Sequence, residues 1–214
     1  MARPRKGARP DTRGKILKAA LPEFAAHGYD AAGVDRIARR ARVNKALIYY
    51  YFASKRGLYT ELLHASLVDL AAALRAAVEL PGSAGGRLDR YIQAFVAHLD
   101  AHTHLSPLML RELADGGRHL DEATLCEMLT LPPMLAELIG QGRAEGAFRE
   151  FDPLMLHFVI TGTAMLMASN VPIRRRVRQL GLAEPPVDSG ATTAVLQTIA
   201  SRALRKDHID APIT

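Results

Sequence analysis

Residues 34–55 read VDRIARRARVNKALIYYYFASK, and the fold of the N-terminal part of the chain depends on this stretch. Apolar residues recur at helical spacing in two short segments, so we predict one helix over 34–41 and a second over 45–52. The three residues between them, 42–44, are expected to form a tight turn. Two short helices joined by a turn of this length are typical of a helix-turn-helix.

The second of these helices carries two different faces. Ile48 and Phe52 are four residues apart and share the face that packs against the preceding helix. Successive side chains point about 100° apart, so the three tyrosines at 49–51 do not all cover the edge of the core, which is the alternative explanation for them. Hydroxyls that reach phosphates and rings that touch base edges favour a nucleic-acid groove as the partner of the other face. That face carries a cation, a small side chain and two phenols: Lys45, Ala46, Tyr49 and Tyr50.

Positive charge is concentrated at the same end of the chain. Residues 1–56 hold 14 Lys/Arg and 4 Asp/Glu, a net charge of +10, whereas the other 158 residues hold 14 basic and 18 acidic side chains. Such localised charge favours a polyanionic partner, because contacts to phosphates release condensed counterions. A solvated basic tail is the alternative explanation of this charge.

The remainder of the 214 residues, 49% of which are hydrophobic overall, reads as helix. No segment shows the alternation of a strand, so an all-α fold is predicted. Pro22 removes a backbone hydrogen bond from the first helix, and we expect a kink or break near Leu21 and a helix end at His27-Gly28. Pro132-Pro133 should bend or split a later helix. Further helices are expected at about 54–78, 87–103, 107–115, 120–145, 153–170 and 190–206.

The N-terminal segment resembles the DNA-binding domain of the TetR/AcrR repressors over about residues 11–60. The resemblance implies a three-helix helix-turn-helix domain followed by a larger helical domain for ligand binding and dimerisation. It also implies a homodimeric repressor that leaves a palindromic double-stranded operator when a small effector binds. The strings that carry the resemblance are RGKIL at 13–17, FAAHGY at 24–29, VDRIA at 34–38 and ARVNKALIYYYFASKRGL at 41–58.

The same resemblance suggests how the chain is organised. We expect a basic mobile arm at 1–10, the helix-turn-helix domain at 11–56, the ligand-binding and dimerisation domain at 57–206 and a tail at 207–214. In this family two subunits pair through their last two long helices, which correspond here to about 153–170 and 190–206.

Roles of single residues also follow from the resemblance. Lys45 and Ala46 match the base-reading start of the recognition helix. Tyr49 and Tyr50 match tyrosines that hold operator phosphates. Lys55 matches a lysine at the head of the long helix, where the positive end of the helix dipole also attracts phosphate.

Four positions depart from the family pattern. Gly33 stands where a Ser or Thr usually caps the second helix and touches phosphate, so that contact is expected to be missing. Asn44 replaces the usual cap of the recognition helix, which is a benign change. Arg42 occupies a turn position normally held by Gly, where a positive φ would cost about 1 kcal/mol but adds a cation near DNA. The fourth is Pro22. The predicted DNA-binding residues are Arg42, Asn44, Lys45, Ala46, Tyr49, Tyr50 and Lys55.

The helix expected over 153–170 is apolar almost all round, as for a helix buried on several sides. A membrane span is the alternative, since about 18 residues at 1.5 Å each reach roughly 27 Å. His157, Thr161 and Thr163 interrupt the apolar run, and no membrane association is expected. The cluster Arg174–Arg178 reads as a solvated connection between the two dimer helices, with a second phosphate patch as the alternative.

The resemblance to the TetR/AcrR repressors implies an effector pocket between the middle helices and the dimer helix, and the candidate residues there give it a soft, adaptable lining. Ordinary core packing is the alternative for each lining residue. His98, His102 and His104 suggest a metal site, but no further ligand completes a set, so neither a metal nor a cofactor is expected. The predicted lining residues are Phe95, His98, Met109, Leu113, Met128, Met134, His157, Thr161 and Met165.

Two other classes of function remain open at this point. A ligand-independent DNA-binding activator or architectural protein would use the larger domain for dimerisation alone. An enzyme is not expected, because no nucleophile–base pair, phosphate loop or paired carboxylates stand out. The single Cys126 and the lack of an apolar segment after the basic N-terminus favour a cytoplasmic location.

Overall fold

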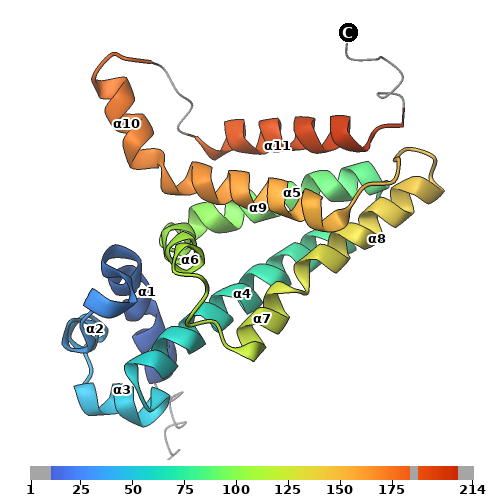
Figure 1. The fold of residues 1–214 in the computed structure, drawn as a ribbon. Helices are drawn as coiled ribbons and strands as arrows, with labels where there is room; N and C mark the ends of the chain where they lie inside the picture. Colours follow the sequence, from blue (N-terminus) through green and yellow to red (C-terminus); the bar gives the residue numbers. More distant parts are fainter. Residues whose placement is uncertain (1–10, 184–187, 207–214) are drawn as a thin grey trace, which may run out of the picture. The chain divides into compact units, whose positions relative to one another are not determined.

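A computed structural model describes residues 11–183 and 188–206, and most of these residues are helical (Figure 1). Apart from one isolated bridge between Phe148 and Arg205, these ranges contain no β-pairing, so the predicted all-α fold is confirmed. The arm expected at 1–10 and the tail expected at 207–214 lie outside the described residues. The chain divides into two units, one up to Leu62 and one from Leu63, and the division falls within a helix.

Four helices contribute to the first unit: α1 (Thr12–Ala31), α2 (Val34–Ala41), α3 (Lys45–Phe52) and the start of α4 (Lys55–Glu79). The bounds of α2 and α3 are those predicted from the apolar spacing. Ile37, Ile48 and Phe52 are buried, as that spacing requires. Phe24 of α1 and Tyr59 of α4 add an edge-to-face contact between rings 4.8 Å apart, which closes the core from the other side.

Helix α1 continues through its proline. The backbone stays helical through Pro22, so the helix does not break near Leu21, which was one of the two outcomes expected there. Pro22 has no N–H to donate to the Lys18 carbonyl, and Lys18 lies on the exposed side of the helix, where such a loss is tolerated. The departure from helical geometry comes at Gly28, with φ 72° and ψ 177°, where the helix was expected to end.

Only two residues, Ala53 and Ser54, join α3 to α4. Ala53 has φ 61° and ψ −38°, and the Ser54 N–H donates to the Phe52 carbonyl at 2.6 Å, which makes a γ-turn. Ser54 Oγ accepts the Gly57 N–H at 2.9 Å and caps α4. A Cβ at residue 57 would overlap the Phe52 carbonyl oxygen. The corner therefore requires glycine at this position, and it sets the direction in which α4 leaves α3.

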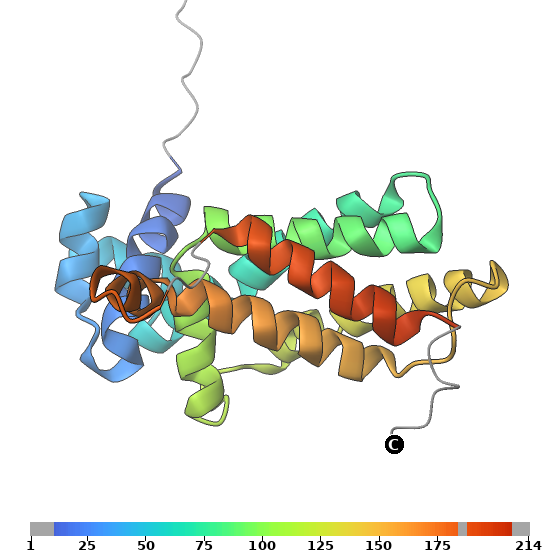
Figure 2. The same cartoon turned by 90° about the horizontal axis from the view of Figure 1, so that it is seen from above.

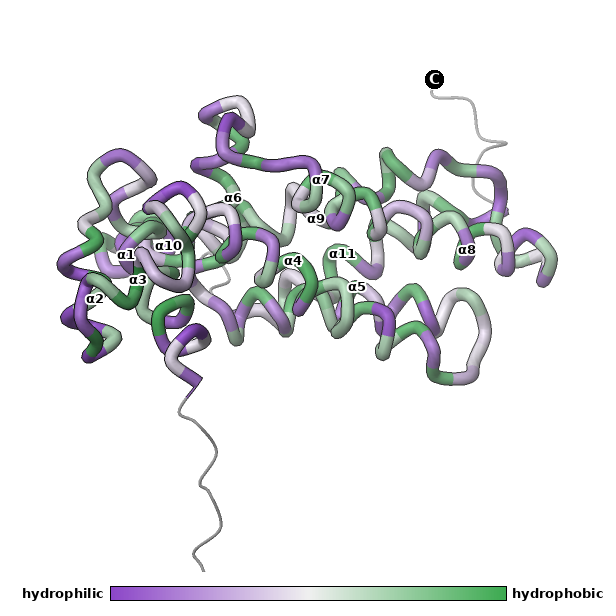
Figure 3. Tube along the Cα trace, turned by 90° about the horizontal axis from the view of Figure 1, so that it is seen from below, coloured by the Kyte–Doolittle hydropathy of each residue, from purple (hydrophilic) through white to green (hydrophobic). Residues whose placement is uncertain are grey.

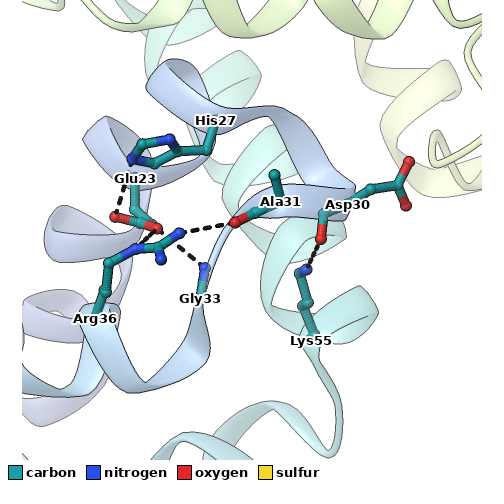
Figure 4. A network of polar contacts seen from close by, with 7 residues as sticks. All are labelled: Glu23, His27, Asp30, Ala31, Gly33, Arg36 and Lys55. Atoms are coloured by element: carbon teal, nitrogen blue, oxygen red, sulfur yellow. Dashed lines mark hydrogen bonds and ion pairs between the residues drawn. The ribbon is translucent and has the colours of Figure 1, made fainter.

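A buried carboxylate ties α1 to α2 (Figure 4). Glu23 Oε1 accepts the Gly33 N–H at 3.0 Å and the Arg36 Nε–H at 2.5 Å, and His27 Nε2 lies 3.9 Å from Oε2. Burial raises the pKa of Glu23, but the hydrogen bonds from Gly33 and Arg36 and the positive charges of Arg36 and His27 together outweigh burial and hold it below its usual value. A Cβ at Gly33 would lie 3.1 Å from the guanidinium carbon of Arg36, so the missing side chain leaves room for this ion pair.

In the second unit α5 packs against α8, α9 and α11, and α6 packs against α9. Helices α9 and α11 run side by side (Figure 2). Apolar and polar residues alternate along the helices, as expected where each helix buries one face (Figure 3). The helices of this unit, after the remainder of α4, are α5 (Ala84–Ala101), α6 (Leu105–Ala114), α7 (Glu122–Met128), α8 (Leu131–Ala144), α9 (Pro153–Ser169), α10 (Val171–Gln179) and α11 (Ser189–Leu204).

The second unit corrects one sequence expectation, confirms another and agrees with a third except at Arg174. Helix α5 starts at Ala84 rather than near 87, because Ser83 caps it through a bond from the Gly86 N–H. The stretch 120–145 is split, with Pro132-Pro133 in the first turn of α8, where proline is tolerated. The arginine cluster 174–178 lies in α10, which connects α9 to α11, and Arg175, Arg176 and Arg178 are exposed, as expected of a solvated connection. Arg174 differs: it is buried, and its Nη2 donates to the Met167 carbonyl at 2.5 Å.

Replacing Glu23 by Gln should lower the free energy of unfolding of the first unit by about 2 kcal/mol at neutral pH, because the charge that accepts these bonds is lost. Since the pKa of Glu23 is lowered in the folded protein, its stabilisation is complete above the usual value of 4.5 and is lost as the pH falls through the lower folded value. The difference between Glu23→Gln and wild type, measured by hydrogen exchange of amides in α1 and α2, should therefore shrink in acid.

Glu61→Gln is the matched control, since it removes the half-exposed partner of Arg13 in the same unit. It should cost well below about 1 kcal/mol, as exposed pairs do. If Glu23→Gln lowers the free energy of unfolding equally at neutral and acidic pH, the ionised carboxylate of Glu23 is not what stabilises the first unit.

Candidate nucleic-acid interface and ligand cavity

Helix α3 presents a row of exposed aromatic side chains. Tyr50 is 79% exposed, and Tyr49 and Tyr51 are 43% and 40% exposed. Ile48 of the same helix is fully buried in the core. Two rings of the row, those of Tyr50 and Tyr51, meet edge to face at 5.2 Å. Large apolar rings at this exposure are unusual on a surface with no partner. The residues of the turn and of α3 that were predicted to bind DNA are all exposed: Arg42, Asn44, Lys45, Ala46, Tyr49 and Tyr50.

The turn before α3 is built as its sequence suggests. Arg42 adopts the left-handed conformation, φ 56° and ψ 44°, which costs a residue with a Cβ about 1 kcal/mol. Asn44 Oδ1 accepts the Ala46 N–H at 2.9 Å and caps α3. Both features place the guanidinium-bearing residue directly before the exposed face of α3.

An open hollow of about 550 Å³ adjoins this turn, between the start of α1, the end of α2 and the start of α3. Three cations line it: Lys15, Arg40 and Arg42. Sequence reasoning did not single out Lys15 and Arg40. Both belong to the basic segment 1–56, but their meeting across 25 residues depends on how α1 and α2 pack. The hollow adds Lys15 and Arg40 to the positive charge beside the exposed face of α3.

Lys45 at the start of α3 is paired within the unit. Its Nζ lies 3.0 Å from Asp35 of α2, and the hydrogen bond and charge of Asp35 raise the pKa of Lys45. Both side chains are well exposed, so water screens this pair and exchanging Asp35 for another acceptor costs little. The pair therefore holds Lys45 in place without burying its ammonium group.

Lys55 has a different environment from the other predicted DNA-binding residues. Its Nζ donates to the Asp30 carbonyl at 3.0 Å and lies 4.9 Å above the centre of the Tyr29 ring. These contacts tie the first turn of α4 to the end of α1 (Figure 4). The cation thus also has a structural role, which its position at a helix start did not indicate.

The second unit contains a cavity of about 180 Å³ walled by six helices, α4 to α9. Of the residues predicted to line a pocket, His98 and Met134 lie elsewhere: Met134 is buried in α8, and His98 stacks on His102 with ring centres 4.1 Å apart. Sequence reasoning missed Phe158 and Gly162 of α9 and six lining leucines: Leu67, Leu70, Leu99, Leu105, Leu110 and Leu131. The predicted residues that the cavity does bring together are Phe95, Met109, Leu113, Met128, His157, Thr161 and Met165.

Polar groups are scarce in this cavity. Thr161 Oγ1 donates to the His157 carbonyl at 2.7 Å, within α9. The ring of His157 makes no hydrogen bond through Nδ1, which is buried, and burial lowers its pKa. The imidazole is therefore neutral at pH 7, and it is the one ring among the lining residues with hydrogen-bonding nitrogens.

Neither a metal site nor a single membrane-spanning helix occurs among the described residues. In the ranges 11–183 and 188–206 no three metal-ligating side chains come together, and His98 and His102 stack on each other instead. No single described helix is long and apolar enough to cross a membrane, although α9 and α10 pass that test as a pair bent by 51°.

Residues 16–62 match the sequence profile of bacterial regulatory proteins of the tetR family, and residues 86–199 match that of the tetracyclin repressor-like C-terminal domain. The HTH-type transcriptional repressor SCO4008 of Streptomyces coelicolor is 40% identical over 87 residues, 41% of this chain and 44% of that protein. The HTH-type transcriptional activator FasR of Mycolicibacterium smegmatis is 38% identical over 87 residues, 41% of this chain and 40% of that protein. The chain thus matches less than half the length of either relative.

The fold recurs in the transcriptional regulator FadR from Bacillus subtilis, whose structure was solved in complex with stearoyl-CoA. The two structures share a TM-score of 0.73, with 89% of this chain and 98% of that chain covered at 18% identity. At this identity the likeness concerns the fold.

Arg42→Gly should separate stability from nucleic-acid binding. Glycine adopts φ 56° without a Cβ penalty, so the free energy of unfolding should rise by about 1 kcal/mol. Loss of the cation should weaken duplex binding and reduce the slope of log K against log salt by about 1. Denaturant titration and fluorescence anisotropy at several salt concentrations measure the two effects.

Ala53→Gly is the matched control, because Ala53 is the other described non-glycine residue at positive φ. It should gain stability without losing duplex affinity. Equal salt slopes for Arg42→Gly and wild type would remove Arg42 from the interface.

Proposed function

The chain belongs to the tetR family of bacterial regulatory proteins, and on that premise we propose that it is a homodimeric repressor of transcription. It binds a palindromic operator through α3 and leaves it when a small, largely apolar effector enters the cavity of the second unit. The observation that carries the proposal is the row of exposed tyrosines on α3, set beside exposed cations. The relatives reported above are transcriptional regulators by name, and no catalytic role is proposed.

The exposed face of α3 supports insertion into a major groove. Helix α3 has eight residues, and the small side chain of Ala46 lets it approach the bases closely. Tyr49 and Tyr50 carry hydroxyls that can reach the phosphates of the DNA backbone. Lys15, Arg40 and Arg42 flank the helix and supply the charge that phosphate contacts need. Gly33 offers no hydroxyl and its N–H donates to Glu23, so no phosphate contact is proposed at this position.

The cavity supports an effector rather than a purely structural second unit. Its volume, about 180 Å³, exceeds the voids of an ordinary core, which seldom hold more than a water molecule. Its lining is apolar except for His157 and Thr161, so the effector is mostly hydrocarbon with a polar group that meets the imidazole. The stearoyl-CoA of the FadR complex is much larger than this volume, and we propose a compact effector here.

Helix α4 offers a route from cavity to DNA. Leu67 and Leu70 of α4 line the cavity, and the same helix begins at the corner that follows α3. An effector that shifts α4 would change the separation of the two recognition helices from the roughly 34–36 Å that half-sites one turn apart require.

A ligand-independent activator or architectural protein is the second candidate. The activator named among the relatives keeps the sign of regulation open, and a dimerisation domain needs no cavity. The cavity favours a regulator that responds to a ligand. A ligand that releases the protein from its operator would decide between the two candidates.

Tyr50→Phe should weaken binding about tenfold to an operator selected from random duplex DNA, because one hydrogen bond of about 1–1.5 kcal/mol to phosphate is lost. Tyr51→Phe is the matched control: it makes the same change at the next residue, which points away from the groove-facing rows. Fluorescence anisotropy gives both affinities. Equal losses for the two variants would show that the hydroxyl of Tyr50 has no specific role.

The affinity of the cavity for a neutral, largely apolar fluorescent arylamine, N-phenyl-1-naphthylamine, should fall in acid. Burial lowers the pKa of His157 below 6.5, so at neutral pH the ring is uncharged, and as the pH falls through the lowered value a cation appears in the apolar cavity. Fluorescence titrations of His157→Leu should lose this pH dependence, whereas the exposed His102→Leu should keep it. A pH profile that survives His157→Leu would exclude His157 from the site.

A further inference from the structure

Helix α9 carries no Asp, Glu, Lys or Arg along its 17 residues, yet one side of it is exposed. Helix α11 beside it exposes further apolar side chains. An uncharged surface rich in Phe, Met and Leu has the composition of an interface core. The exposed apolar residues are Leu154, Met155, Phe158, Val159 and Leu166 of α9, and Val195 and Ile199 of α11, which we call the α9–α11 stripe.

The size of the α9–α11 stripe fits a second copy of the chain. Its members are 40–58% exposed, and at about 150–250 Å² for a whole large side chain they present on the order of 600 Å² of apolar surface. A stable interface of standard size buries about 800 Å² per partner. A two-fold axis brings the same patch of both copies together, so an uncharged stripe is complementary to itself.

The cavity opens at the edge of this stripe. Phe158 and Gly162 of α9 both line the cavity and are exposed, and Phe158 is 57% exposed. Across from them Leu113 of α6, also a lining residue, is 50% exposed. One chain therefore leaves part of the cavity wall open to solvent, on the side where the stripe lies.

We propose that the partner subunit closes this cavity. The second copy, packed along the α9–α11 stripe, covers Phe158 and Gly162, so that the effector is enclosed between two subunits rather than within one. This inference rests on the proposed homodimer and goes beyond it, because it makes the ligand site incomplete in a single chain. Ligand binding and dimerisation then strengthen each other by the same factor.

Gly162 supports a close approach by the partner. A Cβ at this position meets no atom of the chain within 4 Å, so the fold of one subunit does not require glycine there. Glycine within a helix nevertheless costs about 1 kcal/mol relative to alanine. A small residue in the middle of an exposed apolar stripe lets two helix backbones come near each other, which seals the opening beside Phe158.

The test compares Gly162→Leu with Gly140→Leu. Gly140 also lies within a helix, is exposed, and would place a Cβ in open space, but it belongs to α8 and lies outside the stripe and the cavity. Sedimentation equilibrium gives the dimer constant, and N-phenyl-1-naphthylamine fluorescence gives ligand affinity. Gly162→Leu should weaken both by at least tenfold while its circular dichroism stays that of wild type, and Gly140→Leu should change neither.

Dilution of the wild-type protein tests the same point without a mutation. Across the dimer–monomer transition the probe should bind the dimer at least tenfold more tightly, and saturating probe should tighten the dimer by the same factor. A dimer that binds the probe no better than the monomer overturns the inference and leaves the proposed homodimer standing. A chain that is monomeric at all concentrations, or that floats with phosphatidylcholine vesicles through the stripe, overturns both.

Discussion

The close approach of Gly57 to the Phe52 carbonyl is the constraint on which the geometry of α3 and the start of α4 depends. It allows α4 to start two residues after α3 ends, with Phe52 buried and Tyr50 exposed on the same short helix. The γ-turn at Ala53 leaves this corner little freedom, since both its backbone and its cap are hydrogen-bonded. A stiff joint transmits movement of α4 to α3 that a flexible loop would absorb. The proposed release from DNA relies on that stiffness.

Much of the first unit was predictable because its signals are local. Apolar spacing defined α2 and α3, and Ser54 and Asn44 cap through bonds to residues two or three positions away. Contacts between distant residues left no such signal. The Glu23 carboxylate meets Arg36 thirteen residues on, and nothing in the spacing of either predicts it. The effect of Pro22 could not be decided for a related reason, since it depends on whether Lys18 faces water.

The cavity shows where helical spacing stops being informative. His157, Thr161 and Met165 recur every four residues and share one side of α9, so their meeting was predictable. His98 and Met134 have similar chemistry but lie on other sides of their helices, and a sequence of mixed polarity does not fix the rotation of a helix about its axis. The exposed stripe on α9 could not be predicted because the helix is apolar on every side. Its sequence does not show which side packs within the chain and which side is left for another copy.

Phe158 belongs to two surfaces at once, the wall of the cavity and the exposed side of α9. A substitution there alters the shape offered to a ligand and the shape offered to a second chain in the same event. After a gene duplication, a substitution at Phe158 would therefore change the ligand specificity and the dimer partner of one copy at the same time. A copy that gains a new ligand through this residue would also form fewer mixed dimers with the original protein.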